Sequence, residues 1–215
     1  MVKLTDLGFT KAEIFETILS TFNPDGTADA APMGVTMQNS QTISLNLYNS
    51  SQTSRNLKAN TCAVINLTSD IEVFYKTTFK EANPNGKLPQ EWFEKEEAVN
   101  APKLRSADAT VAVTIVKIEP NGAEKTKFSC NIQRIDTSKV YPQVYCRAMS
   151  ATLEAILHAT RVKLFINDSS KQKDVGKLVG LIENSNDIVN RTAPNSAYSA
   201  VMTDLMTRID GRREP

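Results

Sequence analysis

The sequence has few of the residues that build disulfide frameworks, metal centres and histidine-based sites. Its 215 residues include three cysteines and a single histidine, His158. The cysteines, Cys62, Cys130 and Cys146, are odd in number and form no CxxC pair. We therefore expect neither a disulfide framework nor a metal site, but buried or indifferent free thiols in a cytoplasmic protein.

Long apolar runs and an excess of one charge are also missing. No run approaches the roughly 20 apolar residues that span a bilayer, and residues 1–11 lack the pattern of a signal peptide. The 25 basic and 24 acidic residues leave a formal charge of +1. We expect no membrane partner and no nucleic-acid partner held by a general basic field.

Glycine is scarce too, with eight residues and no GxGxxG turn for a dinucleotide. The sequence also contains no GxSxG, no HExxH and no P-loop. These absences argue against a dedicated dinucleotide-binding fold and against the common hydrolase sites.

Strand patterns dominate the first two-thirds of the chain. Residues 23–26, Asn-Pro-Asp-Gly, predict a hairpin turn, because Pro24 presets its φ and Gly26 can adopt a left-handed conformation. Residues 80–106 break the pattern, and we expect an excursion there with a short helix near 90–97. The predicted strands cover 13–22, 27–37, 42–48, 62–67, 71–79, 107–118 and 124–136, with a helical turn at 55–60.

From about residue 140 the apolar period becomes helical. Helices are predicted over 146–164, 171–184 and 195–209, the last one capped by Asn195 or Ser196. Strands followed by helices indicate an α+β fold, with a β-domain at 1–138 and a helical subdomain at 139–215.

The helix at 146–164 has two distinct sides. Its predicted apolar face holds Cys146, Met149, Leu153, Ile156, Leu157, Thr160 and Leu164. Arg147, Glu154 and Arg161 follow one another at intervals of seven on the opposite side, together with His158. This row is either a solvated face or part of a pocket for an anionic group, and a lone histidine without a partner defines no acid–base site.

The chemically informative stretch lies between residues 13 and 68. Hydroxyl groups cluster at Ser50, Ser51, Thr53 and Ser54, where a helical turn begins, and Arg55 follows. A helix start of this kind either caps itself or binds a phosphate. Before it, Pro32-Met33-Gly34-Val35 predicts an extended backbone that a planar ring could approach at Gly34, unless this glycine marks a bulge.

The same stretch resembles the flavin-reductase-like FMN-binding split barrels. It is most similar to a small, largely archaeal family of uncharacterised split-barrel proteins with an added helical C-terminal region. The matching residues are Gly26, Ala30 to Gly34, Thr53, Arg55, Asn56, Leu57 and Asn66 in the first half. The run CRAMSATLEAILHATRV matches a family helix through Arg147, Glu154, Ala159, Thr160 and Arg161, although Cys146 stands where relatives often have asparagine.

The resemblance implies an antiparallel split β-barrel that binds FMN near a homodimer interface. The phosphate would lie at Ser50, Ser51, Gln52 and Thr53, helped by Arg55 or Asn56. The flavin ring would lie along Pro32, Met33, Gly34 and Val35 and near Tyr48.

Three functions stay open. The first is a flavoprotein oxidoreductase whose electron donor and acceptor are unknown. The others are a non-catalytic FMN-binding or storage module, and an interaction domain without flavin.

Overall fold

A computed structural model describes residues 2–11, 14–138 and 147–210. The chain forms two compact units, and each is described by itself. One unit consists of residues 1–68 and 79–141, and the other of residues 69–78 and 142–215. The α+β fold predicted from the sequence is confirmed, since an antiparallel barrel precedes the C-terminal helices.

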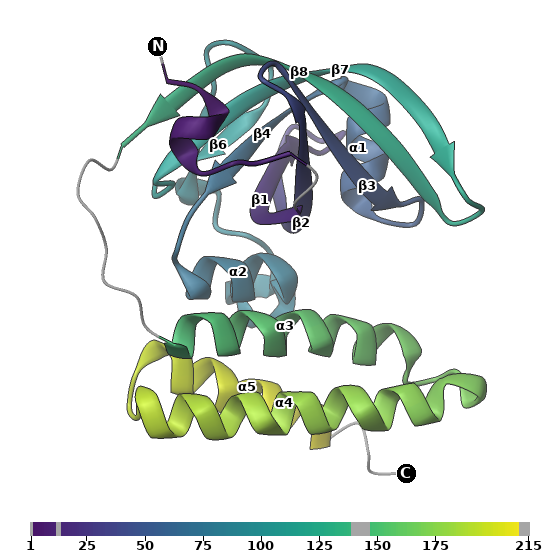
Figure 1. The fold of residues 1–215 in the computed structure, drawn as a ribbon, viewed down its shortest axis with the longest axis vertical. Helices are drawn as coiled ribbons and strands as arrows, with labels where there is room; N and C mark the ends of the chain where they lie inside the picture. The colour runs from purple at the N-terminus through teal and green to yellow at the C-terminus, as the bar shows by residue number, and fades with distance from the viewer. Residues whose placement is uncertain (1, 12–13, 139–146, 211–215) are drawn as a thin grey trace. The chain divides into compact units, whose positions relative to one another are not determined.

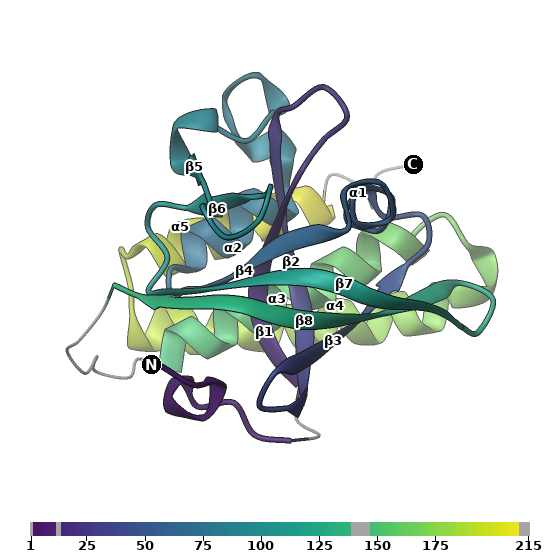
Figure 2. The ribbon, with the colours of Figure 1, turned by 90° about the horizontal axis from the view of Figure 1, so that it is seen from above.

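Six antiparallel strands close into a barrel in the order β1-β2-β3-β8-β7-β4 (Figure 1). In Figure 2, β1 and β2 run across the direction of β7 and β8, as expected when strands close into a small barrel. The strands are β1 (Ile14–Phe22), β2 (Ala28–Asn39), β3 (Thr42–Tyr48), β4 (Cys62–Leu67), β7 (Ala109–Asn121) and β8 (Lys125–Thr137).

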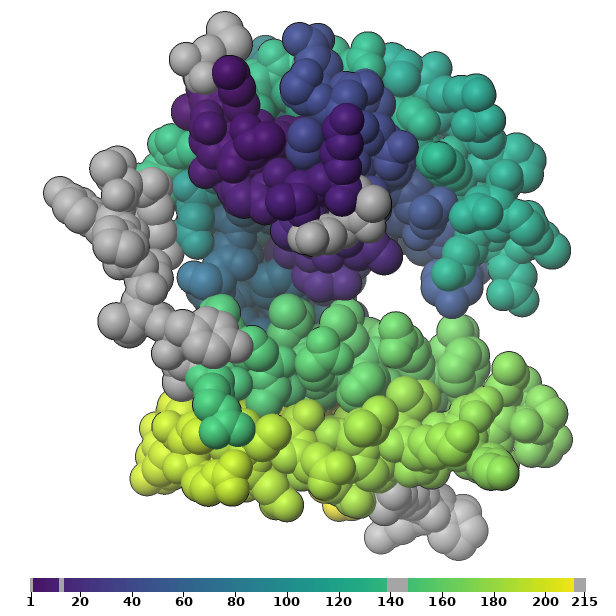
Figure 3. Space-filling model, viewed as in Figure 1, coloured from purple at the N-terminus to yellow at the C-terminus, as the bar shows by residue number. Residues whose placement is uncertain are grey.

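The barrel core follows from the alternation of apolar residues along the strands. Ile43, Leu45 and Leu47 of β3 are all buried in one cluster, as the strict alternation in this segment predicts. Phe128 and Cys130 of β8 complete the same cluster and are fully buried. In Figure 3, β1 and β2 lie beside the N-terminal segment, which contains the 3-10 helix η1 (Leu4–Leu7).

Strands β2 and β3 pair over only part of their length. Residues 35–39 of β2 pair with residues 42–45 of β3. Beyond this point, residues 28–34 of β2 stay paired with β1, whereas residues 46–48 of β3 stay paired with β8. We call this divergence the β2–β3 fork. Helix α1 (Gln52–Asn60) follows β3 and packs against strands β1 to β4.

The turn between β1 and β2 confirms the sequence prediction. Gly26 has φ 81°, in the left-handed region that favours glycine. The backbone N–H of Gly26 donates to Asn23 O at 2.9 Å, and Asn23 N–H donates to Thr27 O at 2.8 Å. The hairpin register follows from this tight turn.

The excursion between β4 and β7 contains no α-helix within the barrel unit, so the helix expected near 90–97 is wrong. A single 3-10 turn, η4 (Gln90–Trp92), leads directly into β5 (Phe93–Lys95), which pairs with β6 (Pro102–Leu104). The short turns η2 (Lys80–Ala82) and η3 (Pro84–Gly86) precede it. Pro84 and Pro89, which lack an N–H donor, keep these turns short.

Asn66 anchors this excursion to the barrel. Its side-chain amide donates to Ile18 O at 2.9 Å and to Ser20 Oγ at 2.8 Å. Its Oδ1 accepts from Leu104 N–H at 2.8 Å, while Ser20 Oγ donates to Pro102 O at 2.6 Å. Asn66 is fully buried. This residue, one of those that match the family, therefore stabilises the fold.

Residues 71–79, predicted as a strand, instead form helix α2 (Ile71–Thr78) of the second unit. Their β-branched and aromatic side chains favour a strand, but Asp70 caps a helix by accepting from Glu72 N–H at 2.9 Å. Contacts with α3 and α5 then bury Tyr75, whose hydroxyl accepts from Arg208 Nε at 3.1 Å. Tertiary packing therefore overrides the strand propensity.

The other helices are α3 (Arg147–Phe165), α4 (Gln172–Thr192) and α5 (Ala197–Asp210), with the 3-10 turn η5 (Ser169–Lys171) before α4. Ser196 caps α5, since its Oγ accepts from Ser199 N–H at 3.3 Å. Throughout residues 2–11, 14–138 and 147–210, none of the helices has the length and hydropathy needed to cross a membrane.

The buried face of α3 differs from the predicted one. The buried residues are mostly small: Ala148, Ala151, Thr152, Ala155, Ile156, Ala159 and Val162. Leu164, expected on the apolar face, is 61% exposed, and Cys146 lies outside the described residues. The helical wheel predicted that the large residues are inside, but alanines allow closer helix packing.

Candidate ligand site at the β2–β3 fork

The start of α1 is built by Ser51. Its Oγ accepts from Ser54 N–H at 3.1 Å and donates to Tyr48 O at 2.8 Å. The helix therefore begins three residues before the turn predicted at 55–60. Because the first N–H groups of a helix have no intrahelical partner, those of Gln52 and Thr53 can serve a ligand. The hydroxyl of Ser51, a predicted phosphate ligand, already caps the helix.

Arg55 and Asn56 hold the loop before α1 together. Arg55 donates to Ser50 O and to Gln52 Oε1, both at 2.7 Å. Asn56 is buried, and its amide donates to Thr21 Oγ1 and Asn23 Oδ1, both at 3.0 Å. Asn56 is thereby committed to the β1–β2 turn, whereas the guanidinium of Arg55 remains exposed beside the helix start.

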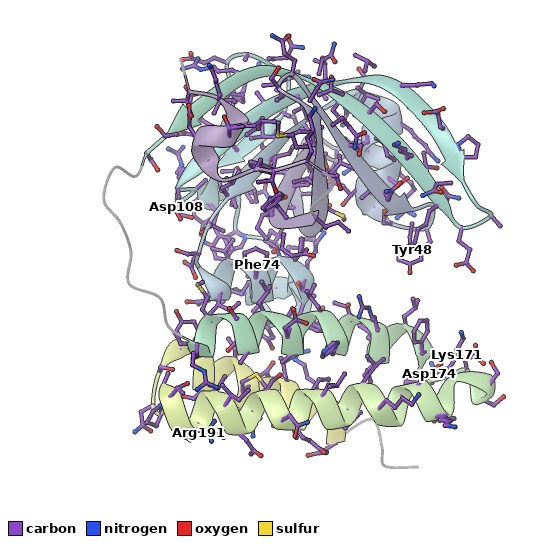
Figure 4. The ribbon with its side chains drawn as sticks, viewed as in Figure 1. Tyr48, Phe74, Asp108, Lys171, Asp174 and Arg191 are labelled. Carbon is purple, nitrogen blue, oxygen red and sulfur yellow. The ribbon has the colours of Figure 1, made fainter. Side chains whose placement is uncertain are left out.

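Tyr48 ends β3 on the other side of the fork. Its side chain is 44% exposed and projects from the strand end (Figure 4). Lys125 Nζ lies 4.4 Å from the centre of the Tyr48 ring, a cation–π contact that holds a positive charge beside the exposed ring.

The predicted ring-binding strand edge lies opposite Tyr48 across the fork. Pro32, Met33 and Gly34 are partly buried, and Val35 is fully buried in the barrel core. Within the described residues, no strand pairs with 28–34 on the side away from β1. The Gln90 side chain accepts from Ala28 N–H at 2.7 Å and donates to Ala28 O at 3.2 Å, so the open part of the edge begins after Ala28. Thr17 Oγ1 donates to Met33 O at 3.0 Å from the β1 side.

The close packing of β1 against β2 leaves no room for a side chain at position 34. A Cβ at this position would lie 2.7 Å from Ile14 Cγ2, closer than real Cβ atoms approach. Its φ is not positive, so the residue is neither a left-handed turn nor a bulge in the β1–β2 register. The glycine was predicted to let a ligand approach the backbone closely. In the structure, the side chain of Ile14 on β1 already approaches Gly34 closely.

Ser54 belongs to the predicted hydroxyl cluster but is not among the predicted site residues. Its Oγ is buried and, among the described residues, has no hydrogen-bond partner. Thr53 beside it is also buried. Only the structure shows that the Ser54 hydroxyl lacks a partner within the described ranges, because Ser50, Ser51 and Ser54 look equivalent in the sequence.

The second group of candidates lies in the helical unit. Arg147, Glu154 and Arg161 are all exposed on α3. Glu154 Oε2 lies 3.8 Å from His158 Nε2, and burial lowers the pKa of His158 although Glu154 opposes this. His158 is therefore neutral near pH 7. Whether this row faces a ligand stays a prediction.

Sequence comparison identifies the family. The family model described as "Protein of unknown function (DUF447) N-terminal domain" matches residues 15–139, which is more than half of the chain. The chain belongs to this family. No curated protein matches the chain.

Similar solved structures agree with this assignment. An FMN-bound protein from Methanosarcina mazei of the same family has a TM-score of 0.77 at 23% identity, with 96% of this chain and 99% of that chain covered. Component B of nitrilotriacetate monooxygenase from Bacillus cereus has a TM-score of 0.50 at 15% identity, with 70% and 83% covered. A putative flavin reductase with a split-barrel domain from Shewanella frigidimarina has a TM-score of 0.50 at 11% identity, with 60% and 69% covered. The fold is therefore that of the flavin-reductase-like split barrels, as the resemblance implied.

Proposed function

We propose that this chain binds FMN at the β2–β3 fork and acts as an oxidoreductase of the flavin-reductase type. One observation carries the proposal. The β2 arm of the fork has an open backbone edge, and the β3 arm leads into the start of α1. The FMN-bound relative from Methanosarcina mazei supports the choice of ligand.

The phosphate is assigned to the start of α1. The N–H groups of Gln52 and Thr53 and the positive end of the helix dipole favour an anion there. Arg55 supplies a formal charge from the same turn, and its contacts to Ser50 and Gln52 hold the loop in place. The donors present fit a phosphate.

The planar ring is assigned to the backbone edge at Pro32–Gly34, next to the paired and buried Val35, with Tyr48 on the opposite arm. Unpaired backbone N–H and C=O groups can bond to the polar edge of such a ring. Bound FMN would supply hydride and electron transfer. The protein would orient the ring and set its electrostatic environment through Lys125 and Arg55.

A non-catalytic FMN-binding or storage module is the second candidate. The residues proposed to contact FMN include no histidine, carboxylate or cysteine that could move a proton. This composition suits a binder as well as an enzyme in which the flavin performs the chemistry. Rapid reduction of the bound flavin by NADH or NADPH in a stopped-flow instrument identifies the enzyme, and inertness toward every donor identifies the binder.

A titration with FMN tests the shared part of both candidates. We expect a flavin spectrum or quenching of flavin fluorescence, and at least about tenfold weaker binding in Arg55→Met, because a hydrogen bond to a charged group is lost. Lys58→Met, an exposed change in the last turn of the same helix, is the matched control and should leave the affinity unchanged. A colourless protein that quenches no FMN would leave only the flavin-free interaction domain.

The proposal also includes the oligomeric state and the cellular location of the protein. We expect a homodimer with the flavin near its interface, which sedimentation with and without FMN would measure. A cytoplasmic location accords with the free, buried thiols of Cys62 and Cys130.

A further inference from the structure

A cleft of about 880 Å³ opens on the barrel unit beside the start of α1. Its walls come from the β1–β2 turn, from Gln52 and from the excursion between residues 80 and 91. Gln52 connects it to the fork, because the side chain of Gln52 also bonds to Arg55 and Asn56. The excursion, none of whose residues is assigned to the flavin, therefore forms one wall of this cleft.

Asp29 is the unusual group in this cleft. It is only 4% exposed, and its Oδ1 pairs with the ammonium group of Lys80. Its other oxygen, Oδ2, is buried and has no hydrogen-bond partner in the part of the chain that the structure describes. A buried carboxylate oxygen without a donor is costly, and a ligand that donates a hydrogen bond would remove this cost.

The remaining lining defines the rest of the ligand. Pro24, Ala28, Pro84, Leu88 and Pro89 supply apolar walls. The lining carries three carboxylates, Asp25, Asp29 and Glu91, against two ammonium groups, Lys80 and Lys87. The surplus is negative, which disfavours an anion. Since Lys80 already neutralises Asp29, a neutral donor suits Oδ2 better than a second cation would.

We propose that this cleft binds a small, neutral, partly apolar molecule that donates an amide or hydroxyl hydrogen to Asp29 Oδ2. The cleft borders the proposed phosphate position at Gln52, and we propose that its occupant binds alongside FMN rather than in its place. Through Gln52 its occupant touches the loop that Arg55 and Asn56 organise.

Two ring compounds of nearly equal shape test the proposal without any variant. Benzamide donates an N–H, whereas benzoate has no donor and carries a negative charge. Each is titrated into the ¹⁵N-labelled protein, with and without FMN, while the backbone amide of Gly86 in the cleft wall is followed. We expect benzamide to shift this signal with millimolar affinity, as is usual for so small a ligand, and benzoate to leave it in place.

Two variants localise the effect. Asp29→Asn keeps the size of the side chain but replaces the open acceptor, and it should weaken benzamide roughly tenfold or more. Asp25→Asn is the control in the same cleft, because Asp25 already accepts from Thr27 N–H and Oγ1 and should not affect affinity. Thermal unfolding shows whether each variant is folded, and the two-compound comparison in the unaltered protein decides the matter if Asp29→Asn is not.

Three results would overturn the proposal. Gly86 could remain unshifted by benzamide, or benzamide and benzoate could bind equally well. Alternatively, FMN could displace benzamide competitively, which would make the cleft part of the flavin site. The first two results do not depend on whether FMN binding itself is observed.

Discussion

At the residue scale, the thiol of Cys130 is an ionisable group in an apolar environment. It is fully buried in the barrel core, and burial raises its pKa from 9.0 to about 12. The thiol is therefore protonated, and we regard it as a structural apolar residue with no redox role.

This burial has a consequence for stability in alkali. Above pH 9 the unfolded chain loses the Cys130 proton while the folded chain keeps it, so stability falls as the pH rises from about 9 to about 12. We expect a shallower decline in Cys130→Ala than in the unaltered protein, measured by urea unfolding at several pH values. Equal slopes in the two proteins would show that the thiol is not protected by burial.

Asn66 is the polar residue on which the excursion depends. Asn66→Leu keeps the volume but leaves the buried Leu104 N–H and Ile18 O without its amide, at a cost of about 1–3 kcal/mol for each unpaired group. Asn46→Leu on β3 is the control, since Asn46 is exposed and a surface change costs within about 0.5 kcal/mol. Urea unfolding compares them, and similar losses in both variants would contradict the anchoring role.

At the element scale, the pairing of β1 with β2 depends on Gly34. Gly34→Ala places a Cβ against Ile14 Cγ2, and overpacking of this kind costs about 1–3 kcal/mol. Because Ile14 is 70% exposed, Ile14→Ala should cost little alone and should restore the stability of Gly34→Ala in the double variant. Thermal unfolding of the four proteins measures the coupling.

The same four proteins separate the two roles of Gly34. If the double variant regains stability but binds FMN weakly, the glycine also serves the ligand, as the proposed ring position requires. If stability and FMN binding return together, the close contact with Ile14 accounts for the glycine. Additive losses without any rescue would mean that the Ile14 contact is not the constraint.

At the scale of the whole molecule, helix α2 belongs to a different unit from the residues on either side of it. Residues 69–78 group with the C-terminal helices, and Tyr75 bonds to Arg208 of α5. The β-domain predicted at 1–138 therefore contains a helix whose partners lie beyond residue 138.

A shortened chain tests this arrangement. Residues 1–138 alone should bind a hydrophobic dye and lose solubility, because Tyr75 and its buried neighbours on α2 lose α3 and α5. Replacing residues 69–78 of this fragment by a glycine–serine linker should reduce the dye signal. A fragment that is as soluble and dye-free as the full chain would mean that α2 is stable without the C-terminal helices.

The sequence by itself determined the parts whose structure depends on nearby residues. The alternation in 42–48 and the apolar run at 62–67 predicted β3 and β4 with their observed bounds, and Asn-Pro-Asp-Gly predicted its turn. The α+β order of the chain followed from patterns of the same kind, whereas the family followed from the resemblance of short motifs to known split barrels.

Only the tertiary structure decided the parts that depend on distant residues. It made 71–78 a helix, because the C-terminal helices cover it, and it buried the alanines of α3 in place of its leucines. It committed Asn56 and the Ser51 hydroxyl to the fold. Among the residues that the structure describes, it left Asp29 Oδ2 and Ser54 Oγ without a hydrogen-bond partner. Local propensity cannot foresee these outcomes, because burial and hydrogen-bond satisfaction are set by groups far away in the sequence.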